Sequence, residues 1–307
     1  MSELIPGSFG YFKRVSKPCS VTIGNFDGVH TGHKTLLQSA IEKAKQLQIP
    51  SCVYTFEPSP RSLLAPHLKT PRIMTWQDKI ERIFDCGIDY VVIEEFSSAF
   101  AQHPPNWFAH EIIKNRLNAQ AVTVGYDFRY GRARAGTAQD LQNTLSTVQV
   151  TQIEAQRLNG DIISSSRIRE LISDGKIAIA NQLLGEPFSI RGVVVAGDQR
   201  GREIGFPTAN VESNADLVPS SGVYAVQIQV NRGTWHDAMV NLGTRPTFGG
   251  RRFKIEVHIF NFHQDIYGDE LTVRFIQRIR SERRFDSAAQ LTEQLHTDMK
   301  KVRDCLG

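Results

Sequence analysis

Two patterns of hydrophobic and polar positions divide the chain. In the first half, short β-branched runs alternate with longer stretches whose apolar residues recur at helical spacing. The runs predict strands at residues 21–24, 51–56, 90–93 and 121–125. The periodic stretches predict helices near residues 34–47, 75–86, 106–117 and 137–145. This alternation indicates a parallel sheet covered on both faces, that is, a doubly wound α/β domain.

The pattern changes after a helix that ends with Gly185 and Pro187. Beyond this point, β-branched runs follow one another at short intervals, which is typical of an antiparallel sandwich or barrel. These strands are expected at residues 190–196, 223–230, 235–241, 254–260 and 271–279. Apolar residues at helical spacing over 288–302 then predict a C-terminal helix packed on the barrel. We therefore expect two domains, residues 1–186 and 187–307.

Composition agrees with two ordinary globular domains. The chain has 307 residues, of which 40% are hydrophobic and 22% are charged. It contains no apolar run of membrane-spanning length, and its start lacks a signal-peptide pattern, so a cytoplasmic protein without a membrane partner is expected. Four cysteines without Cys-x-x-Cys spacing fit buried thiols in a reducing compartment: Cys19, Cys52, Cys86 and Cys305.

The formal net charge of +4 raises the question of a nucleic-acid partner. The arginines are not gathered in one tract with interleaved aromatic residues, and the densest run spans residues 278–284. Such a balance also suits small polyanions such as nucleotides. We therefore expect no nucleic-acid partner.

The most informative segment joins the first predicted strand to the first predicted helix, where residues 24–33 read GNFDGVHTGH. The free N–H groups and the dipole of a helix start form an anion site. His30 and His33 place two imidazoles in the same turn, where they can donate hydrogen bonds to phosphate oxygens. Three residues lack side chains where backbone must turn or approach a ligand: Gly24, Gly28 and Gly32. This combination predicts chemistry on a nucleotide phosphate.

The same turn also has a plainer interpretation. One histidine near a helix start is usually a capping or solvated residue, and two histidines three positions apart can bind a metal. However, no glutamate lies between them as in zinc-protease helices, and no cysteine pair lies nearby. Phosphate chemistry is therefore favoured.

Two further loops carry candidate ligands. Residues 125–131 read GYDFRYG, for which a simple β–α connection would suffice. However, Asp127 adds an acceptor and Phe128 a stacking surface, and Arg129 and Arg134 add phosphate counter-charges. Residues 163–169 read ISSSRIR before a helical pattern. A helix cap needs only one hydroxyl, so the remaining hydroxyls and the arginine are expected to hold outer phosphates: Ser164, Ser165, Ser166 and Arg169.

The second half has its own glycine-rich loop, which ends in GFPTAN at residues 205–210. It is neither a P-loop nor a dinucleotide fingerprint. Thr208 and Asn210 are hard oxygen donors two positions apart, so on a strand they share one face and suit magnesium and phosphate oxygens. Glu256 lies in an alternating strand, where a carboxylate is often a salt-bridged structural group.

Together these motifs resemble those of the bacterial bifunctional riboflavin kinase/FAD synthetase family. Residues 24–33 are similar to the expanded His-x-Gly-His signature of its adenylyltransferase half. Residues 205–210 resemble its flavokinase signature. The resemblance covers nearly the whole chain, with the motifs in the family's order. It implies a parallel-sheet nucleotidyltransferase domain followed by an antiparallel β-barrel domain with a C-terminal helix.

The resemblance also implies the reactions and the residues that serve them. The barrel would phosphorylate riboflavin to FMN with Mg²⁺ and ATP, and the first domain would transfer AMP from ATP to FMN, giving FAD and pyrophosphate. The implied catalytic residues are His30, His33 and, as the base for the riboflavin hydroxyl, Glu256. The implied adenylyltransferase ligands are Gly24, Phe26, Asp27, Gly28, Gly32, Asp127, Phe128, Arg134, Ser164, Ser165, Ser166 and Arg169. The implied kinase ligands are Gly197, Gly201, Gly205, Pro207, Thr208, Asn210, Arg280 and Arg283, with Thr208 and Asn210 at the metal.

The chain departs from the family pattern at three positions. Tyr130 replaces a phenylalanine and Ser166 stands for a threonine, and both changes keep the main chemical group. Ser59, in the FEPSP segment at residues 56–60, stands where the family commonly has histidine. The role of that histidine is therefore not transferred to this chain.

Two rival functions stay open. One is an adenylyl- or cytidylyltransferase for another phosphate with a non-catalytic flavin-binding barrel, and the residues 207–210 argue against it. The other is a flavin- or RNA-binding regulator that has lost catalysis, which the intact pair His30 and His33 argues against.

Overall fold

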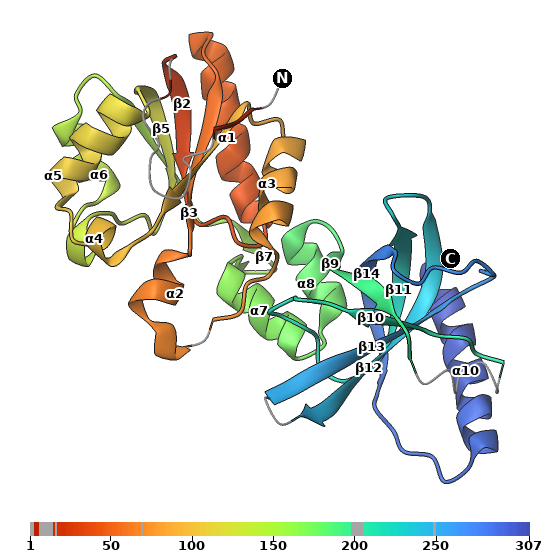
Figure 1. Cartoon of the computed structure of the whole chain (residues 1–307). Coiled ribbons are helices and arrows are strands. Elements are labelled where there is room, and N and C mark those ends of the chain that lie inside the picture. The colour runs from red at the N-terminus through yellow and green to blue at the C-terminus, as the bar shows by residue number, and fades with distance from the viewer. Residues whose placement is uncertain (1–2, 6–14, 16, 69, 198–204, 248–249) are drawn as a thin grey trace. The chain divides into compact units, whose positions relative to one another are not determined.

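A computed structural model describes the chain at residues 3–5, 15, 17–68, 70–197, 205–247 and 250–307 (Figure 1). By its contacts the chain forms two compact units. The first comprises Met1–Pro71 and Thr75–Ser164, and the second comprises Arg72–Met74 and Ser165–Gly307. No helix of the described residues is long and apolar enough to cross a membrane.

The first unit is built on one sheet in the order β1-β4-β3-β2-β5-β6, and every neighbouring pair is parallel. Its strands are β1 (Glu3–Ile5), β2 (Cys19–Ile23), β3 (Ser51–Glu57), β4 (Tyr90–Glu95), β5 (Ala119–Gly125) and β6 (Gln149–Ile153). After β2 the chain adds β3 and β4 on one side and then β5 and β6 on the other. In open α/β sheets, ligands bind beyond the carboxyl ends of the strands where the order reverses in this way. The turns after β2 and β5 meet at that point.

Helices cover both faces of this sheet, as predicted. Figure 1 shows α1 (Thr31–Leu47) and α3 (Trp76–Asp85) on one face, with α5 (Pro105–Trp107) and α6 (Ala138–Thr144) on the other. The helix predicted near 106–117 continues from α5 as the π-helix η2 (Phe108–Arg116). Its last turn closes with a bond from the N–H of Leu117 to the carbonyl of Ile112, five residues back, at 2.8 Å.

Several short elements of the first unit were not predicted. They are β1, β6, β7 (Arg157–Leu158), β8 (Asp161–Ile162), α2 (Pro60–Leu64), η1 (Pro66–Leu68), α4 (Ser98–Ala101) and η3 (Arg132–Arg134). Most are too short for a periodic pattern. The edge strand β6 is largely exposed and polar, so it lacks the apolar run that marks a buried parallel strand.

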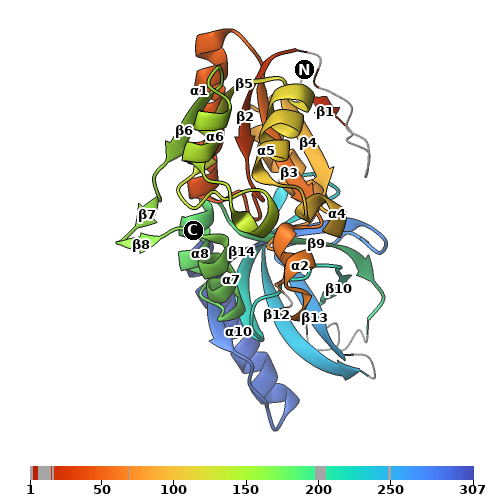
Figure 2. The same ribbon diagram turned by 90° about the vertical axis from the view of Figure 1, so that its left-hand side faces the viewer.

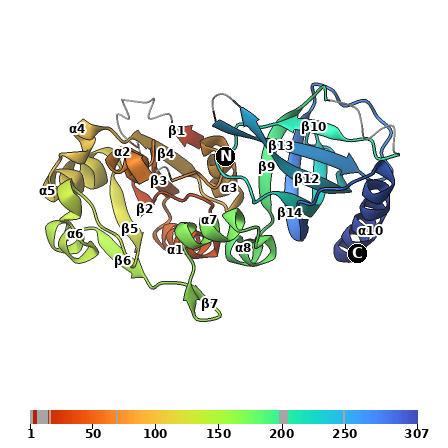
Figure 3. The ribbon, with the colours of Figure 1, turned by 90° about the horizontal axis from the view of Figure 1, so that it is seen from below.

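The second unit contains a closed antiparallel barrel in the order β10-β13-β12-β11-β14-β9, so the prediction of a barrel is confirmed. Its strands are β9 (Phe188–Val195), β10 (Ala209–Glu212), β11 (Gly222–Val230), β12 (Trp235–Thr247), β13 (Gly250–Ile259) and β14 (Glu270–Ser281). Tyr224, Val226 and Ile228 are fully buried at alternate positions of β11. Ala225 and Met239 instead belong to the apolar cluster that packs with α10 (Ala288–Leu306), which lies along the outside of the barrel (Figure 3). The four-residue β10 was not predicted.

A helical pair precedes the barrel and is joined to it. Figure 2 shows α7 (Ser165–Ser173) beside α8 (Ile177–Leu184). Asn181 donates from Nδ2 to the carbonyl of Phe275 and accepts at Oδ1 from the N–H of Phe188, both at 2.8 Å. Between the helices Gly175 has φ +74°, and a Cβ there would lie 2.6 Å from Ser220 Oγ. A functional boundary between residues 186 and 187 stays a prediction.

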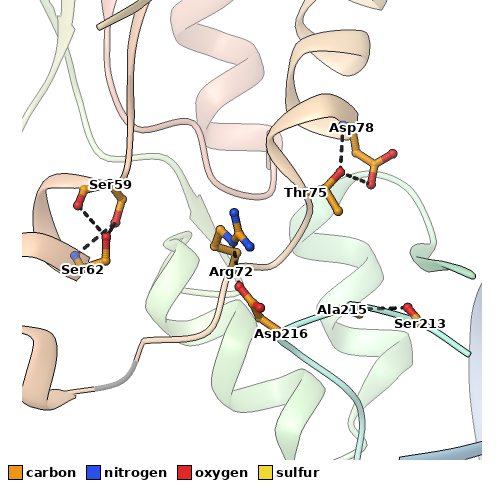
Figure 4. A network of polar contacts seen from close by, with 8 residues as sticks. All are labelled: Ser59, Ser62, Arg72, Thr75, Asp78, Ser213, Ala215 and Asp216. Carbon is orange, nitrogen blue, oxygen red and sulfur yellow. Dashed lines mark hydrogen bonds and ion pairs between the residues drawn. The ribbon is translucent and has the colours of Figure 1, made fainter. Parts of the chain in front are cut away.

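The short segment Arg72–Met74 is also attached to the second unit. Arg72 Nε lies 2.6 Å from Asp216 Oδ2, in a half-exposed ion pair (Figure 4). The chain then enters α3, whose cap is Thr75, since its Oγ1 accepts from the N–H of Asp78 at 3.1 Å. Exposed ion pairs of this kind add little to stability.

Candidate functional site

The turn of residues 24–33, here called the histidine turn, has an unusual backbone. Phe26 and Val29 have φ of +50° and +39°, and Gly28 between them has φ of +91°. Positive φ at a bulky or β-branched residue is rare, and such conformations are concentrated at functional sites. Phe26 is fully buried, and a Cβ on Gly24 would lie 3.1 Å from its ring. The absent side chain at Gly24 therefore lets the ring pack against the backbone.

Both histidines lie at the N-terminal end of α1. His30 is the cap, and its Nδ1 accepts a hydrogen bond from the N–H of His33 at 3.2 Å. Because Nδ1 accepts, a neutral His30 carries its proton on Nε2. The two rings stack with centroids 3.5 Å apart, and the Phe26 ring meets His33 edge-on at 5.2 Å. The helix start thus combines two adjacent imidazoles with the positive end of the dipole, which suits a phosphate.

The loop after β5 lies beside this helix start. A Cβ on Gly125 would come 3.5 Å from Asp127 Oδ1 and 3.8 Å from Leu36 Cδ1 of α1. The loop closes on itself through a bond from the N–H of Phe128 to the carbonyl of Gly125 and one from Arg134 Nη2 to the carbonyl of Asp127, at 3.1 and 3.4 Å. Asp127 and Arg134 are exposed. Their polar groups are therefore accessible to a ligand next to the histidine turn.

Tyr130 has a packing role in the same loop. It stacks on Phe128 with centroids 5.5 Å apart, and a Cβ on Gly136 would lie 2.7 Å from its ring. Burial raises the pKa of Tyr130 to about 12. The ring that this chain has in place of a phenylalanine therefore supports the loop as a neutral aromatic group.

The hydroxyl-rich segment begins close to the histidine turn. The N–H of Ile163 donates to the carbonyl of Gln156 at 2.9 Å, and Gln156 Cβ lies 3.7 Å from the position of a Cβ on Gly32. Ser164 follows directly and ends the first unit. The remaining candidates of the segment lie on α7 and so in the second unit: Ser165, Ser166 and Arg169.

Ser59, which stands where the family commonly has histidine, caps a helix. Its Oγ accepts from the N–H of Ser62 at 3.2 Å at the start of α2, and the two hydroxyls lie 3.1 Å apart (Figure 4). A serine N-cap is among the preferred residues at this position. The local structure thus uses Ser59 as a cap.

In the second unit a row of polar side chains crosses three strands. Asn210 of β10 is paired with Glu256 of β13, which is paired with Asn241 of β12. Directly opposed residues share one face of a sheet. On β13 the apolar residues Ile255 and Val257 are buried, so Glu256 lies on the opposite, outer face with one quarter of its side chain exposed. The sequence pattern of β13 thus brings a carboxylate between two amides.

Two neighbours hold the Glu256 carboxylate. Lys254 Nζ lies 2.7 Å from Oε1, and Asn241 Nδ2 donates to Oε2 at 3.4 Å. Lys254 is two positions away on the same strand and so on the same face. The ion pair with Lys254 is what a structural carboxylate would have, whereas the exposed quarter of the Glu256 side chain leaves the carboxylate accessible to a substrate.

The glycine-rich loop approaches this row at Asn210. A Cβ on Gly197 would lie 1.8 Å from Asn210 Nδ2, so no side chain fits there without moving the amide. Gly201 lies outside the described residues. Gly205 has φ +80° and open space around it, so its backbone conformation, rather than a close contact, favours glycine. Thr208 directly precedes β10.

His258 fixes the approach to β10. Its Nδ1 lies 2.8 Å from the carbonyl of Pro207, and because a carbonyl only accepts, Nδ1 carries the proton. Its ring also packs on Phe206, with centroids 5.2 Å apart. Burial lowers the pKa of His258, while the bond to Pro207 opposes that shift. The GFPTAN segment is therefore held by a neutral histidine from β13.

Arg280 and Arg283 both donate hydrogen bonds to side chains of α10. Arg280 Nε donates to Asp298 Oδ2 at 2.8 Å, and Asp298 is fully buried. Arg283 Nη1 donates to Gln294 Oε1 at 3.4 Å. Val223 of β11 is paired with Asn241 of β12 on one side and with Arg280 of β14 on the other. Arg280 therefore lies two strands from the end of the polar row.

Some of these site residues were not predicted. They are Asn241, Lys254 and Asp298. Asn241 and Lys254 occupy outer-face positions of their strands, where polar residues are expected, so neither carries a signal of a site. Asp298 has a signal, because it is a carboxylate at a buried position of α10. Only cross-strand pairing, which sequence alone does not supply, identifies the partners of Asn241.

A parallel sheet with two histidines at a helix start, and a barrel in which Glu256 lies between two amides, suit a nucleotide-dependent transferase with two modules. A family model described as FAD synthetase matches residues 12–167, and one described as riboflavin kinase matches residues 184–306. The bifunctional riboflavin kinase/FMN adenylyltransferase of Escherichia coli is 36% identical over 307 residues, covering 99% of this chain and 98% of that protein. The chain belongs to the family of bifunctional riboflavin kinases/FMN adenylyltransferases.

Two further comparisons agree with this assignment in extent and in fold. The Bacillus subtilis protein of the same description is 37% identical over 288 residues, covering 92% of this chain and 90% of that protein. A crystal structure described as a macrolide-efflux protein from Streptococcus pneumoniae superposes with a TM-score of 0.89 at 34% identity. That superposition covers 98% of both chains, so each unit has a counterpart of the same fold in that protein.

Proposed function

We propose that the chain makes FAD from riboflavin in two steps at two separate sites. The second unit transfers the γ-phosphoryl group of ATP to riboflavin, which gives FMN and ADP. The first unit transfers AMP from a second ATP to FMN, which gives FAD and pyrophosphate. The observation that supports this most strongly is that each unit holds its own reactive set, stacked imidazoles at a helix start in one and a carboxylate between amides in the other.

In the adenylyl transfer, a phosphate oxygen of FMN attacks the α-phosphorus of ATP, and the bond to the β-phosphate breaks. Negative charge then increases on the oxygens around the α-phosphorus. His30, through Nε2–H, and His33 donate to these oxygens, and the helix dipole favours the same charge. Asp127, Phe128 and Arg134 border the substrates. The hydroxyl of Ser164, the last residue of the first unit, holds the leaving pyrophosphate, and no covalent protein intermediate forms.

In the kinase reaction, Glu256 takes the proton of the riboflavin hydroxyl as that oxygen attacks the γ-phosphorus. Lys254 and Asn241 hold the two carboxylate oxygens, which fixes the direction of the base. Gly197 and Pro207 bring backbone close to the phosphates, and Arg280 and Arg283 border the flavin side.

A magnesium ion fits the donor set of the second unit. Thr208 and Asn210 would hold it through their oxygens, and the close approach of Gly197 fixes the Asn210 amide. Among the described residues no cluster of three or more His, Cys, Asp or Glu side chains could hold a metal by itself. Mg²⁺ commonly binds through few protein ligands together with substrate phosphates and water. When bound, the ion neutralises phosphate charge.

The partners proposed are riboflavin, FMN, FAD and ATP, with neither nucleic acid nor membrane, in the cytoplasm. Incubation of the protein with riboflavin, ATP and Mg²⁺, followed by chromatography of the flavins, tests the proposal. FMN should appear first and FAD after it, with one pyrophosphate per FAD. If FMN accumulates without FAD, the barrel is a kinase but the assignment of adenylyl transfer to the first unit is wrong. If no FMN forms, the assignment of the barrel is wrong.

A further inference from the structure

Lys79 is a buried lysine in the first unit, with 5% of the residue exposed. It lies on α3, next to the buried Ile80 and one turn before the buried Ile83, so the helix directs it into the protein. Lysine is among the residues least often buried, because an ammonium loses its hydration there. A buried lysine therefore calls for an explanation by function or by structure.

The ammonium joins two neighbouring segments. Lys79 Nζ donates to Thr55 Oγ1 at 3.1 Å, to the carbonyl of Asn25 at 3.4 Å and to that of Phe56 at 3.5 Å. Thr55 and Phe56 lie at the carboxyl end of β3, whereas Asn25 is the second residue of the histidine turn. Thr55 Oγ1 also contacts the carbonyl of Asn25, at 3.4 Å. One side chain thus links the turn to the adjacent strand.

The histidine turn needs such a link. The residue after Asn25, Phe26, has φ +50°, and Val29 has φ +39°. Backbone in these conformations persists only where the surrounding structure holds it. The N–H of Gly24 donates to the carbonyl of Tyr54 at 3.2 Å, so the turn is already bonded to β3 one residue before Asn25. Hydrogen bonds from a charged donor are stronger than those from a neutral one.

We propose that Lys79 is a positioning residue for adenylyl transfer, since its ammonium fixes the histidine turn against β3 and so sets the place of His30 and His33. The inference rests on the proposed function of the first unit. A shift of the turn by about 1 Å would remove much of the catalytic advantage of the imidazoles, since reaction rates depend steeply on such placement.

Lys79→Met in the full chain tests the proposal, with both activities measured on one preparation. Methionine keeps a similar length and apolar stem but cannot donate. We expect kcat for FAD formation from FMN to fall at least about tenfold. The KM for ATP should change by less than about threefold, because the imidazoles act on charge that develops in the transition state. FMN formation should stay near the wild-type rate. Lys114→Met, the same change at an exposed lysine, is the matched control.

A merely structural lysine gives a different result. Lys79→Met would then lower the melting temperature while each folded molecule kept its FAD-forming rate, or both activities would fall together, and either outcome overturns the proposal. If the variant does not fold, Thr55→Val removes one acceptor in a nearly equal volume. That variant should lower FAD formation severalfold, and an unchanged rate overturns the proposal.

The proposed function and this inference fail separately. If the variant with His30→Ala and His33→Ala keeps normal FAD synthesis, the site itself is misassigned. If that variant loses FAD synthesis while Lys79→Met retains it within about twofold, only the positioning role is wrong.

Discussion

The two units organise their candidate sites in different ways. In the first unit, the site residues lie in the loop after β5 and in the turn and helix start after β2, where His30 and His33 are close in sequence as well as in space. In the second unit, Asn210, Asn241 and Glu256 are distant in sequence and meet only through antiparallel pairing. In the parallel sheet the functional side chains come together at the ends of strands, whereas in the barrel they come together on neighbouring paired strands.

The difference has a mechanical consequence. Side chains on paired strands are fixed by the sheet itself, so Glu256 needs only local neighbours such as Lys254. A loop site has to be held by bonds from elsewhere, as with the turn that carries φ of +39° at Val29. We therefore expect substitutions of site residues on the barrel to lower kinase activity without unfolding the protein. In the first unit, we expect activity to depend also on the residues that hold the histidine turn in place.

The largest effect is expected from Glu256→Gln. Glutamine keeps the volume and the bond from Asn241 but cannot accept the hydroxyl proton. Riboflavin phosphorylation should fall by roughly a hundredfold to ten-thousandfold, and conversion of supplied FMN to FAD should continue. Lys254→Met, which removes the ion pair but keeps the carboxylate, should cost less than about tenfold. If both variants lower only the melting temperature, Glu256 is a structural ion-pair partner and not the base.

The counterpart in the first unit is the double change His30→Ala and His33→Ala. It removes two donors at the α-phosphate, so FAD formation should fall on the order of a hundredfold or more. FMN formation should remain unchanged, because its residues are on the barrel. Steady-state rates of both reactions check this. Normal FAD synthesis in the folded double variant is incompatible with our assignment of the turn.

A smaller effect is expected from Gly197→Ala. Its Cβ would lie 1.8 Å from Asn210 Nδ2, so the amide has to move out of the row that contains Glu256. The kcat/KM of the kinase for ATP should fall by about tenfold. The FAD-forming activity of the same preparation is the control. A kinase that is indifferent to this change would show that Asn210 is not a ligand.

A feature of this molecule can be predicted from the sequence when the residues that form it are close together along the chain. The doubly wound sheet, the barrel and α10 follow from local periodicity, and the histidine turn follows from adjacent residues. β10 and the polar row do not, because four residues carry too little pattern and Asn241 reaches Glu256 only by register. The buried Lys79 breaks an otherwise apolar helix face, and its contacts with Asn25 and Thr55 depend on tertiary structure.

The smallest effect concerns stability in the first unit. Glu94 is buried and accepts a bond from Tyr54 Oη at 2.8 Å; burial raises the pKa of Glu94 above its usual 4.5, and that bond opposes the shift. A raised carboxyl pKa means that the stabilising protonated form is lost as the pH rises. Glu94→Gln should therefore raise stability at pH 7.5 by on the order of 1 kcal/mol, and the gain should vanish toward pH 4.5. Thermal melts at both pH values check this, and a lower melting temperature at pH 7.5 would contradict it.

The central claim is that one chain carries two independent sites, and mixing the two inactive variants tests it most directly. Glu256→Gln should make FAD only from supplied FMN, and the double histidine variant should stop at FMN. Supplied with riboflavin, ATP and Mg²⁺, neither should form FAD alone, whereas the mixture should form it through released FMN. If the mixture yields FMN without FAD, or if either variant alone makes FAD from riboflavin at the wild-type rate, the assignment of one reaction to each unit is contradicted.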